Sequence, residues 1–154
     1  MKNTPLVSVL MPAFNSELYI AEAIDSILNQ SHDNLELIIF DDGSTDGTRA
    51  VIEGYQDPRI VKMLSDQNYG VVRARNEMID RASGQYIALM DADDIADPTR
   101  IEKQLKSIEQ GDCDICGSAQ WVLDESTHQV KKSKDKFTDA DLRSLLSVYC
   151  GLCN

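Results

Sequence analysis

Two clusters of carboxylates are the residues in this sequence that could do chemistry. Asp41-Asp42-Gly43-Ser44 and Asp91-Ala92-Asp93-Asp94 each follow a short apolar run of strand length. Carboxylates that lie close together raise each other's pKa and cost stability, so a cation or a donor-rich ligand best explains such a pair of clusters. Asp, Gly and Ser also suit ordinary turns and helix caps, which is the alternative interpretation of either cluster alone.

The spacing of Asp91 and Asp93 suits a divalent metal ion. Residues i and i+2 at the end of an extended segment project to the same side. Mg²⁺ and Mn²⁺ accept carboxylate oxygens and complete an octahedral shell with water and phosphate oxygens. We therefore expect Asp91 and Asp93 to bind Mn²⁺ or Mg²⁺.

Arg73 and Arg75 are candidate phosphate ligands. Both fall in the first turns of a helix that we expect to follow Gly70. A helix N-terminus offers free N–H groups and partial positive charge, and arginine adds a bidentate clamp. A solvent-facing position is the alternative for each of them.

Alternating strands and helices would position these residues. The apolar periodicity predicts strands at Leu6–Met11, Leu35–Phe40, Arg59–Leu64, Gln85–Met90 and Asp114–Leu123, and helices at Glu17–Gln30, Thr45–Tyr55, Val71–Ala82, Pro98–Gln110 and Thr138–Val148. The polar stretch 124–137 is predicted to be a loop or hairpin. This order predicts an α/β fold, a mostly parallel sheet with helices on both faces. Ligands bind such sheets at the carboxyl ends of the strands, where both clusters fall.

Composition and charge narrow the class of partner. The 154 residues make room for about one domain, with 15 basic and 26 acidic residues and a net charge of −11. Such a chain repels nucleic acid but can bind a nucleotide through a divalent metal. No apolar run approaches the roughly 18 residues of a membrane span. We expect a cytoplasmic protein, with peripheral association at the inner face of the membrane left open.

The cysteines and histidines give weaker signals. Cys113 and Cys116 form one C-x-x-C pair, and Cys150 and Cys153 form another, which leaves zinc open. Side chains three apart on the strand predicted there would point to opposite faces, which favours buried packing for the first pair. The two histidines, His32 and His128, are isolated and are predicted to lie on the surface.

The sequence resembles glycosyltransferase family 2. The residues that carry the resemblance follow the family's order over about residues 6–110: Val7–Asn15, Ile24–Gln30, Glu36–Thr48, Asn68–Gly70, Ala74–Asn76 and Leu89–Asp94. The resemblance implies the GT-A fold, a nucleotide-binding sheet over residues 1–123. It also implies that residues 124–154 begin an acceptor-side region and that the chain is truncated at its C-terminal end.

The resemblance also implies a role for each matched residue. It implies that the donor nucleotide is bound by Pro12, Ala13, Phe14, Asp42, Arg75, Asp91, Ala92 and Asp93. The first three would line the pocket for the base, and Asp42 would accept a hydrogen bond from it. Arg75 would approach the diphosphate, which favours it over Arg73. Asp91 would reach the ribose or a metal-bound water, and Asp93 would bind the metal. Glu17 would lie near this site.

The implied reaction is transfer of a sugar, with inversion, from a nucleotide donor to an acceptor hydroxyl. A UDP-sugar is the expected donor, and a saccharide or lipid-linked acceptor in polysaccharide assembly is the expected partner. Residues 111–154 hold no convincing general base, so we expect that base beyond Asn154. The isolated chain should then bind nucleotide and metal but transfer sugar weakly or not at all.

Three other classes compete with this interpretation. A sugar-nucleotide nucleotidyltransferase would carry a Gly-rich basic loop after the first strand, where this chain has Pro12-Ala13-Phe14-Asn15. A receiver-like signalling module would need its acidic pair after the first strand and a lysine after the fifth, and this sequence has neither. A nucleotide-binding relative without catalysis is left open.

Overall fold

The structure is a computed structural model that describes residues 4–111, 114–124, 127 and 129–132. The chain divides into two compact units, residues 1–106 and 107–154. The boundary at residue 123 between a nucleotide-binding sheet and an acceptor-side region, which the resemblance implies, is a different boundary and stays a prediction. Among the described residues, no helix has the length and apolar character to cross a membrane.

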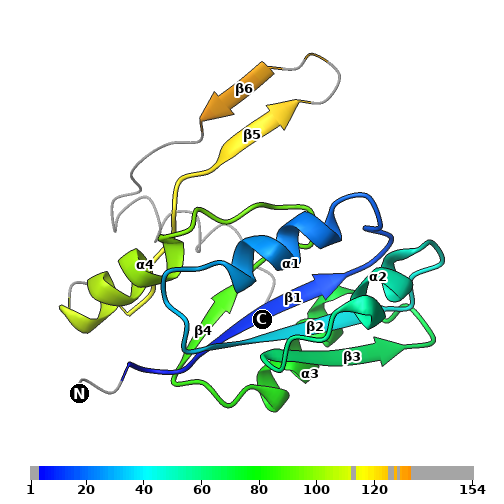
Figure 1. The fold of residues 1–154 in the computed structure, drawn as a ribbon, viewed down its shortest axis with the longest axis horizontal. Coiled ribbons are helices and arrows are strands. Elements are labelled where there is room, and N and C mark those ends of the chain that lie inside the picture. The colour runs from blue at the N-terminus through cyan, green and yellow to red at the C-terminus, as the bar shows by residue number, and fades with distance from the viewer. Residues whose placement is uncertain (1–3, 112–113, 125–126, 128, 133–154) are drawn as a thin grey trace, which may run out of the picture. The chain divides into compact units, whose positions relative to one another are not determined.

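A four-stranded parallel sheet forms the first unit (Figure 1). Its strands are β1 (Val7–Ala13), β2 (Leu35–Asp42), β3 (Ile60–Ser65) and β4 (Tyr86–Leu89), in the order β3-β2-β1-β4. The central pair is nearly all buried, as parallel strands covered on both faces must be. Four of the five predicted strands are thereby confirmed, and their carboxyl ends meet at one edge.

Helices cover both faces of this sheet, as predicted. The helices are α1 (Ile20–Leu28), α2 (Thr48–Gly54), α3 (Val71–Arg81) and α4 (Arg100–Glu109). Buried residues of α1, α2 and α4 join the core cluster that contains Leu37 and Ile39 of β2. Ala74 and Met78 of α3 join the other cluster, with Ile38 and Phe40. Alternate residues of β2 therefore face opposite layers, which decides where the acidic residues at its end point.

The second unit contains a hairpin in place of the predicted fifth parallel strand. β5 (Trp121–Asp124) pairs antiparallel with β6 (Gln129–Lys132), and Trp121 lies opposite Lys132. The strand predicted at Asp114–Leu123 is wrong over 114–120, where glycine, serine and alanine favour strands weakly. Of the loop or hairpin predicted over 124–137, β6 forms the second strand of a hairpin whose first strand, β5, begins earlier, at Trp121.

Two minor predictions also change. Cys116 is half-buried and lies outside any strand, so the predicted strand geometry is wrong there. His32 is buried, not exposed: its Nε2 lies 2.9 Å from the Pro5 carbonyl oxygen and 3.1 Å from that of Asn34. The other cysteines, His128 and the predicted helix Thr138–Val148 lie outside the described residues.

Candidate functional site

A cleft of about 340 Å³ opens at the carboxyl edge of the sheet. The ends of β1 and β2 line it, together with the segments that follow β1, β3 and β4 and the start of α3. Its lining residues are Pro12, Ala13, Phe14, Ser16, Asp42, Asn68, Gly70, Val71, Ala74, Asp91, Ala92 and Asp93. Seven of the eight residues predicted to bind the donor are in this set. Arg75, the eighth, contacts the cleft through Asp91.

Asp42 is buried and already holds two backbone groups. Its Oδ1 accepts the Tyr69 N–H at 2.8 Å, and its Oδ2 accepts the Gly70 N–H at 2.8 Å. An ionised carboxylate has about four acceptor positions, so these bonds leave room for a further donor from the cleft. Sequence reasoning gave Asp42 only a ligand role and missed this attachment to the loop before α3.

Arg75 faces Asp91 across the cleft edge. Its Nη2 donates to Asp91 Oδ1 at 3.1 Å, and the two side chains are 37% and 56% exposed. An ion pair this exposed is weak, so either partner can exchange it for a ligand at little cost. Arg75 Nε is buried without a hydrogen-bond partner among the described residues. A buried donor of this kind is expected to meet an acceptor, and a phosphate oxygen is a good one.

The preference for Arg75 over Arg73 fits the geometry. Arg73 donates to Glu77 at 2.7 Å, one helical turn along α3, and its guanidinium lies 3.8 Å from the centroid of the Tyr69 ring. Both contacts are on the exposed surface, and neither Glu77 nor Tyr69 lines the cleft, whereas Asp91, the partner of Arg75, does. Only Arg75 reaches an acidic residue of the predicted site.

Asp93 differs from the other acidic residues of the site because its carboxylate has no partner among the described residues. It is exposed and lines the cleft two positions after Asp91. Beside it, burial raises the pKa of Asp94, and the charges of Asp91 and Asp93 raise it further. The loop therefore concentrates negative charge at one end of the cleft, which favours a cation there.

No complete metal centre is preformed in the described part of the chain, where no three histidine, cysteine or acidic side chains converge. This arrangement still fits a metal that bridges to a nucleotide. Mg²⁺ in such sites takes one or two carboxylates and completes its shell with substrate phosphates and water. Asp93 supplies one carboxylate, and Asp91 can supply a second one when it no longer pairs with Arg75.

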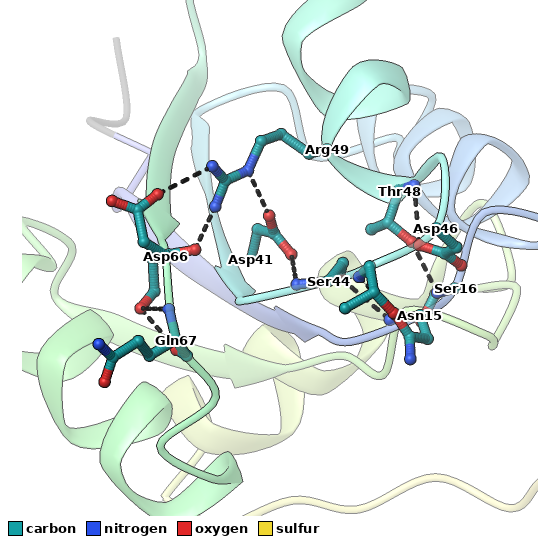
Figure 2. Close-up of polar contacts among 11 residues, drawn as sticks. Asn15, Ser16, Asp41, Ser44, Asp46, Thr48, Arg49, Asp66 and Gln67 are labelled. Atoms are coloured by element: carbon teal, nitrogen blue, oxygen red, sulfur yellow. Dashed lines mark hydrogen bonds and ion pairs between the residues drawn. The ribbon is translucent and has the colours of Figure 1, made fainter.

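Asp41 lies at the predicted edge of the sheet, but it does not line the cleft, so the two acidic clusters do not form one group there. It is fully buried, and Arg49 of α2 donates to it from Nε at 2.9 Å (Figure 2). The Ser44 N–H donates to its other oxygen at 3.0 Å. Because side chains alternate along β2, Asp41 faces α2 while Asp42 faces α3. A protein cation, not a metal, neutralises Asp41.

Arg49 also joins the ends of two strands, a role that the sequence alone did not reveal. Besides Asp41 at the end of β2, it donates to the Ser65 carbonyl oxygen at the end of β3 and, at 3.1 Å, to Asp66 (Figure 2). Hydrogen bonds with Asp41 and then Asp66 raise the pKa of Arg49. Arg49 follows the Asp41–Thr48 motif directly, which was the available signal.

The loops after β1 and β2 are joined by hydrogen bonds between their polar side chains and backbones. The Asn15 N–H donates to Ser44 Oγ at 3.0 Å, and the Thr45 N–H donates to Asn15 Oδ1 at 2.8 Å (Figure 2). Asn15 has a φ of 50°, a left-handed conformation that asparagine tolerates better than most residues. This pairing fixes the backbone next to Phe14 in the cleft.

A second set of bonds continues the attachment toward α1 and α2. The Ser16 N–H donates to Thr48 Oγ1 at 2.7 Å, and Asp46 accepts the N–H groups of Thr48 and Glu17. The Glu17 carboxylate accepts the Gly47 N–H. Glu17 is thus occupied in the loop and is not among the residues that line the cleft. The Ser44–Thr48 part of the motif is structural.

Comparison with known proteins identifies the family. The model of "Glycosyl transferase family 2" matches residues 8–151. A putative teichuronic acid biosynthesis glycosyltransferase of Bacillus subtilis is 42% identical over 111 residues, 71% of this chain and 44% of that protein. An uncharacterized glycosyltransferase of Haemophilus influenzae is 46% identical over 114 residues, 73% of this chain and 35% of that protein. The chain spans less than half the length of these relatives.

Solved structures agree. TarS of S. aureus in complex with UDP-GlcNAc superposes with a TM-score of 0.63 at 28% identity, over 68% of this chain and 31% of that one. A mannosyltransferase of Pyrobaculum calidifontis in complex with GDP-Man and Mn²⁺ superposes with a TM-score of 0.58 at 30% identity, over 64% of this chain and 30% of that one. With the family match over most of its length and this α/β architecture, the chain belongs to glycosyl transferase family 2 and has the GT-A fold.

Proposed function

We propose that this chain binds a nucleoside diphosphate sugar, most simply a UDP-sugar, with a divalent metal, as the donor-binding part of an inverting glycosyltransferase. The observation that carries the proposal is the cleft itself: it brings together residues from the ends of β1 and β2 and from the segments after β3 and β4, which are far apart in the chain. Family 2 membership makes glycosyl transfer from a nucleotide-sugar donor the relevant chemistry. The UDP-GlcNAc and GDP-Man complexes of structural neighbours support the same cleft function.

At one end of the cleft, Phe14 and Asp42 suit a base. Phe14 is 47% exposed, which leaves its ring available for stacking. The unused acceptor positions of Asp42 select a base edge that carries an N–H donor. The imide N–H of uracil is such a donor, and the N1–H of guanine is another.

At the other end, Arg75, Asp91 and Asp93 suit a diphosphate and its metal. Arg75 can exchange Asp91 for a phosphate oxygen, which also frees the Asp91 carboxylate for the ribose or for a metal ligand. Asp93, which has no partner in the described part of the chain, would hold Mn²⁺ or Mg²⁺. Such an ion, when bound, would neutralise charge that develops on the leaving diphosphate. Arg75 would stabilise the same charge by hydrogen bonds.

We place the acceptor site and the general base outside the matched residues. More than half of each relative's length lies beyond its match to this chain. A saccharide or lipid-linked acceptor, peripheral membrane association and a cytoplasmic location accord with a role in polysaccharide assembly such as the teichuronic acid synthesis named for one relative. These 154 residues alone should bind donor without efficient transfer.

A thermal-shift panel of UDP, GDP, CDP and ADP, each with and without Mn²⁺, tests the proposal. We expect one diphosphate to raise Tm, with a larger rise when Mn²⁺ is present. The matched control is the Phe14→Ala variant, which should lose discrimination among the bases while keeping the response to Mn²⁺. No stabilisation by any of the four diphosphates would overturn the proposed function.

A further inference from the structure

We infer that Asp42 is a positioning residue: by holding the 67–70 loop it fixes the start of α3 and so sets Arg75 at the diphosphate end of the cleft. The inference deepens the proposed function and rests on it for the identity of the ligand. It predicts that a substitution at the end of β2 that displaces the loop weakens binding even of a diphosphate ligand that carries no base.

The attachment of the loop is bidentate and buried. Asp42 is 4% exposed, and its two oxygens each accept one backbone N–H, from Tyr69 and from Gly70, both at 2.8 Å. Hydrogen bonds from backbone N–H groups to a carboxylate are among the strong ones in proteins. The two bonds fix both the position and the orientation of the peptide groups that precede α3.

Gly43 presses the same loop against the end of β2. Its φ is +72°, and a Cβ built on it would lie 2.5 Å from the Gln67 carbonyl carbon and 2.7 Å from the Asn68 backbone nitrogen. Those atoms are backbone and cannot move aside alone, so any side chain at this position displaces the loop. The turn that begins the 67–70 loop is closed by Ser65, whose Oγ donates to the Gln67 carbonyl oxygen at 2.7 Å (Figure 2).

Helix α3 depends on this attachment because it has few other constraints. Gly70 is its N-cap residue, with a φ of +88° and no side chain to cap the helix. Only Ala74 and Met78 of its eleven residues are buried. The packing of those two sets the distance of α3 from the sheet, and the Asp42 carboxylate fixes its first residues and complements its N-terminal partial charge.

Arg75 lies directly after buried Ala74 and transmits the position of α3 to the other end of the cleft. Its guanidinium meets Asp91, which follows β4, at 3.1 Å. One path thus runs from the end of β2 through the loop and α3 to the loop after β4. A small displacement of the helix start would move Arg75 away from a phosphate bound beside Asp91.

The test separates loop position from base contact by using a ligand without a base. Calorimetry of inorganic pyrophosphate with Mn²⁺ should show that Gly43→Ala weakens binding about tenfold, the effect of losing about one charge-assisted hydrogen bond from Arg75. Gly43 does not line the cleft, so the variant leaves every ligand-facing side chain in place. Asp42→Asn, which keeps one acceptor oxygen, should weaken binding less than Asp42→Ala.

Gly84→Ala is the matched control. Gly84 lies just before β4, at the opposite end of the sheet from the cleft. A Cβ on this residue would lie 2.6 Å from the Ser8 backbone nitrogen. It should lower Tm as Gly43→Ala does, yet leave the pyrophosphate affinity unchanged. Equal affinity in both glycine variants and the wild type would overturn the inference.

Amide hydrogen exchange tests the attachment in the ligand-free chain, independently of the proposed function. The Tyr69 and Gly70 amides should exchange faster in Asp42→Ala and in Gly43→Ala than in Gly84→Ala. If the wild type binds no pyrophosphate, the proposed function fails while this exchange result still stands. Unchanged exchange at both amides would contradict the positioning role even if pyrophosphate binds.

Discussion

At the scale of single residues, the acidic side chains at this edge of the sheet differ in whether the protein itself supplies a hydrogen-bond donor or a cation for them. Arg49 neutralises Asp41, two backbone N–H groups occupy Asp42, and Arg75 pairs with Asp91. Asp93 has no such partner among the described residues. These four aspartates thus have four different environments, and Asp93, whose carboxylate has no partner among the described residues, is the best candidate to hold a metal.

Arg75→Met is predicted to weaken UDP binding by about tenfold, since one charge-assisted hydrogen bond contributes roughly 1.5 kcal/mol. The affinity for uridine should stay unchanged, because we propose that Arg75 binds the phosphates and not the base. Titrations of both ligands measure the difference. Arg73→Met is the control on the same helix, where the guanidinium contacts Glu77 and Tyr69 instead. An equal loss in both variants would remove the distinction between the two arginines.

At the scale of elements, the loop after β2 is a structural joint whose polar motif has two functions. Its Ser44–Thr48 part binds the loop after β1, and Arg49 ties β2 to the end of β3. Only Asp42, on the other face of the strand, lines the cleft. The motif therefore supports the part of the cleft next to Phe14 and Asp42 mainly through backbone position.

Arg49→Met is predicted to destabilise the chain, because it leaves Asp41 fully buried without a cation. We expect Tm to fall by roughly 10 °C, as losses of buried charge partners do in domains of this size. Asp41→Asn should cost less, since an amide still accepts the Ser44 N–H and buries no charge. Thermal unfolding of both variants measures the order, and a larger loss in Asp41→Asn would contradict it.

The alternation of apolar residues was enough to predict the four parallel strands, the four helices around them and the edge where the site lies. It was not enough to assign Asp41 and Asp42, because neighbours on a strand face opposite layers and the layers are known only after the helices are placed. Arg49 was missed for the same reason: its partners Ser65 and Asp66 come from another strand end. The strand predicted from residue 114 fails over 114–120, where glycine, serine and alanine favour strands weakly.

At the scale of the whole molecule, the matched residues correspond to less than half of each curated relative. The net charge of −11 belongs to these 154 residues, and three of the acidic ones, Asp42, Asp91 and Asp93, line the cleft. Bound metal would offset part of that charge, so chelation should weaken nucleotide binding. Donor recognition and sugar transfer are expected to be separable in this family member.

The 154-residue chain is predicted to bind a UDP-sugar without transferring the sugar efficiently. The physical reason is that deprotonation of the acceptor hydroxyl needs a positioned general base, which we place outside these residues. Release of UDP from UDP-sugars, measured with a coupled phosphatase in the presence of saccharide acceptors, checks this expectation. Turnover in the range of a few per second, typical of complete enzymes, would contradict it.

The central claim, that Asp93 holds a metal which binds the diphosphate, is tested most directly by the coupling between Mn²⁺ and UDP. Calorimetry should measure the UDP affinity with Mn²⁺ and with a chelator, for the wild type, Asp93→Ala and the exposed control Asp80→Ala. We predict that Mn²⁺ tightens UDP binding at least about fivefold in the wild type and the control. The same measurement should show no coupling in Asp93→Ala, and coupling that survives this substitution would contradict the account.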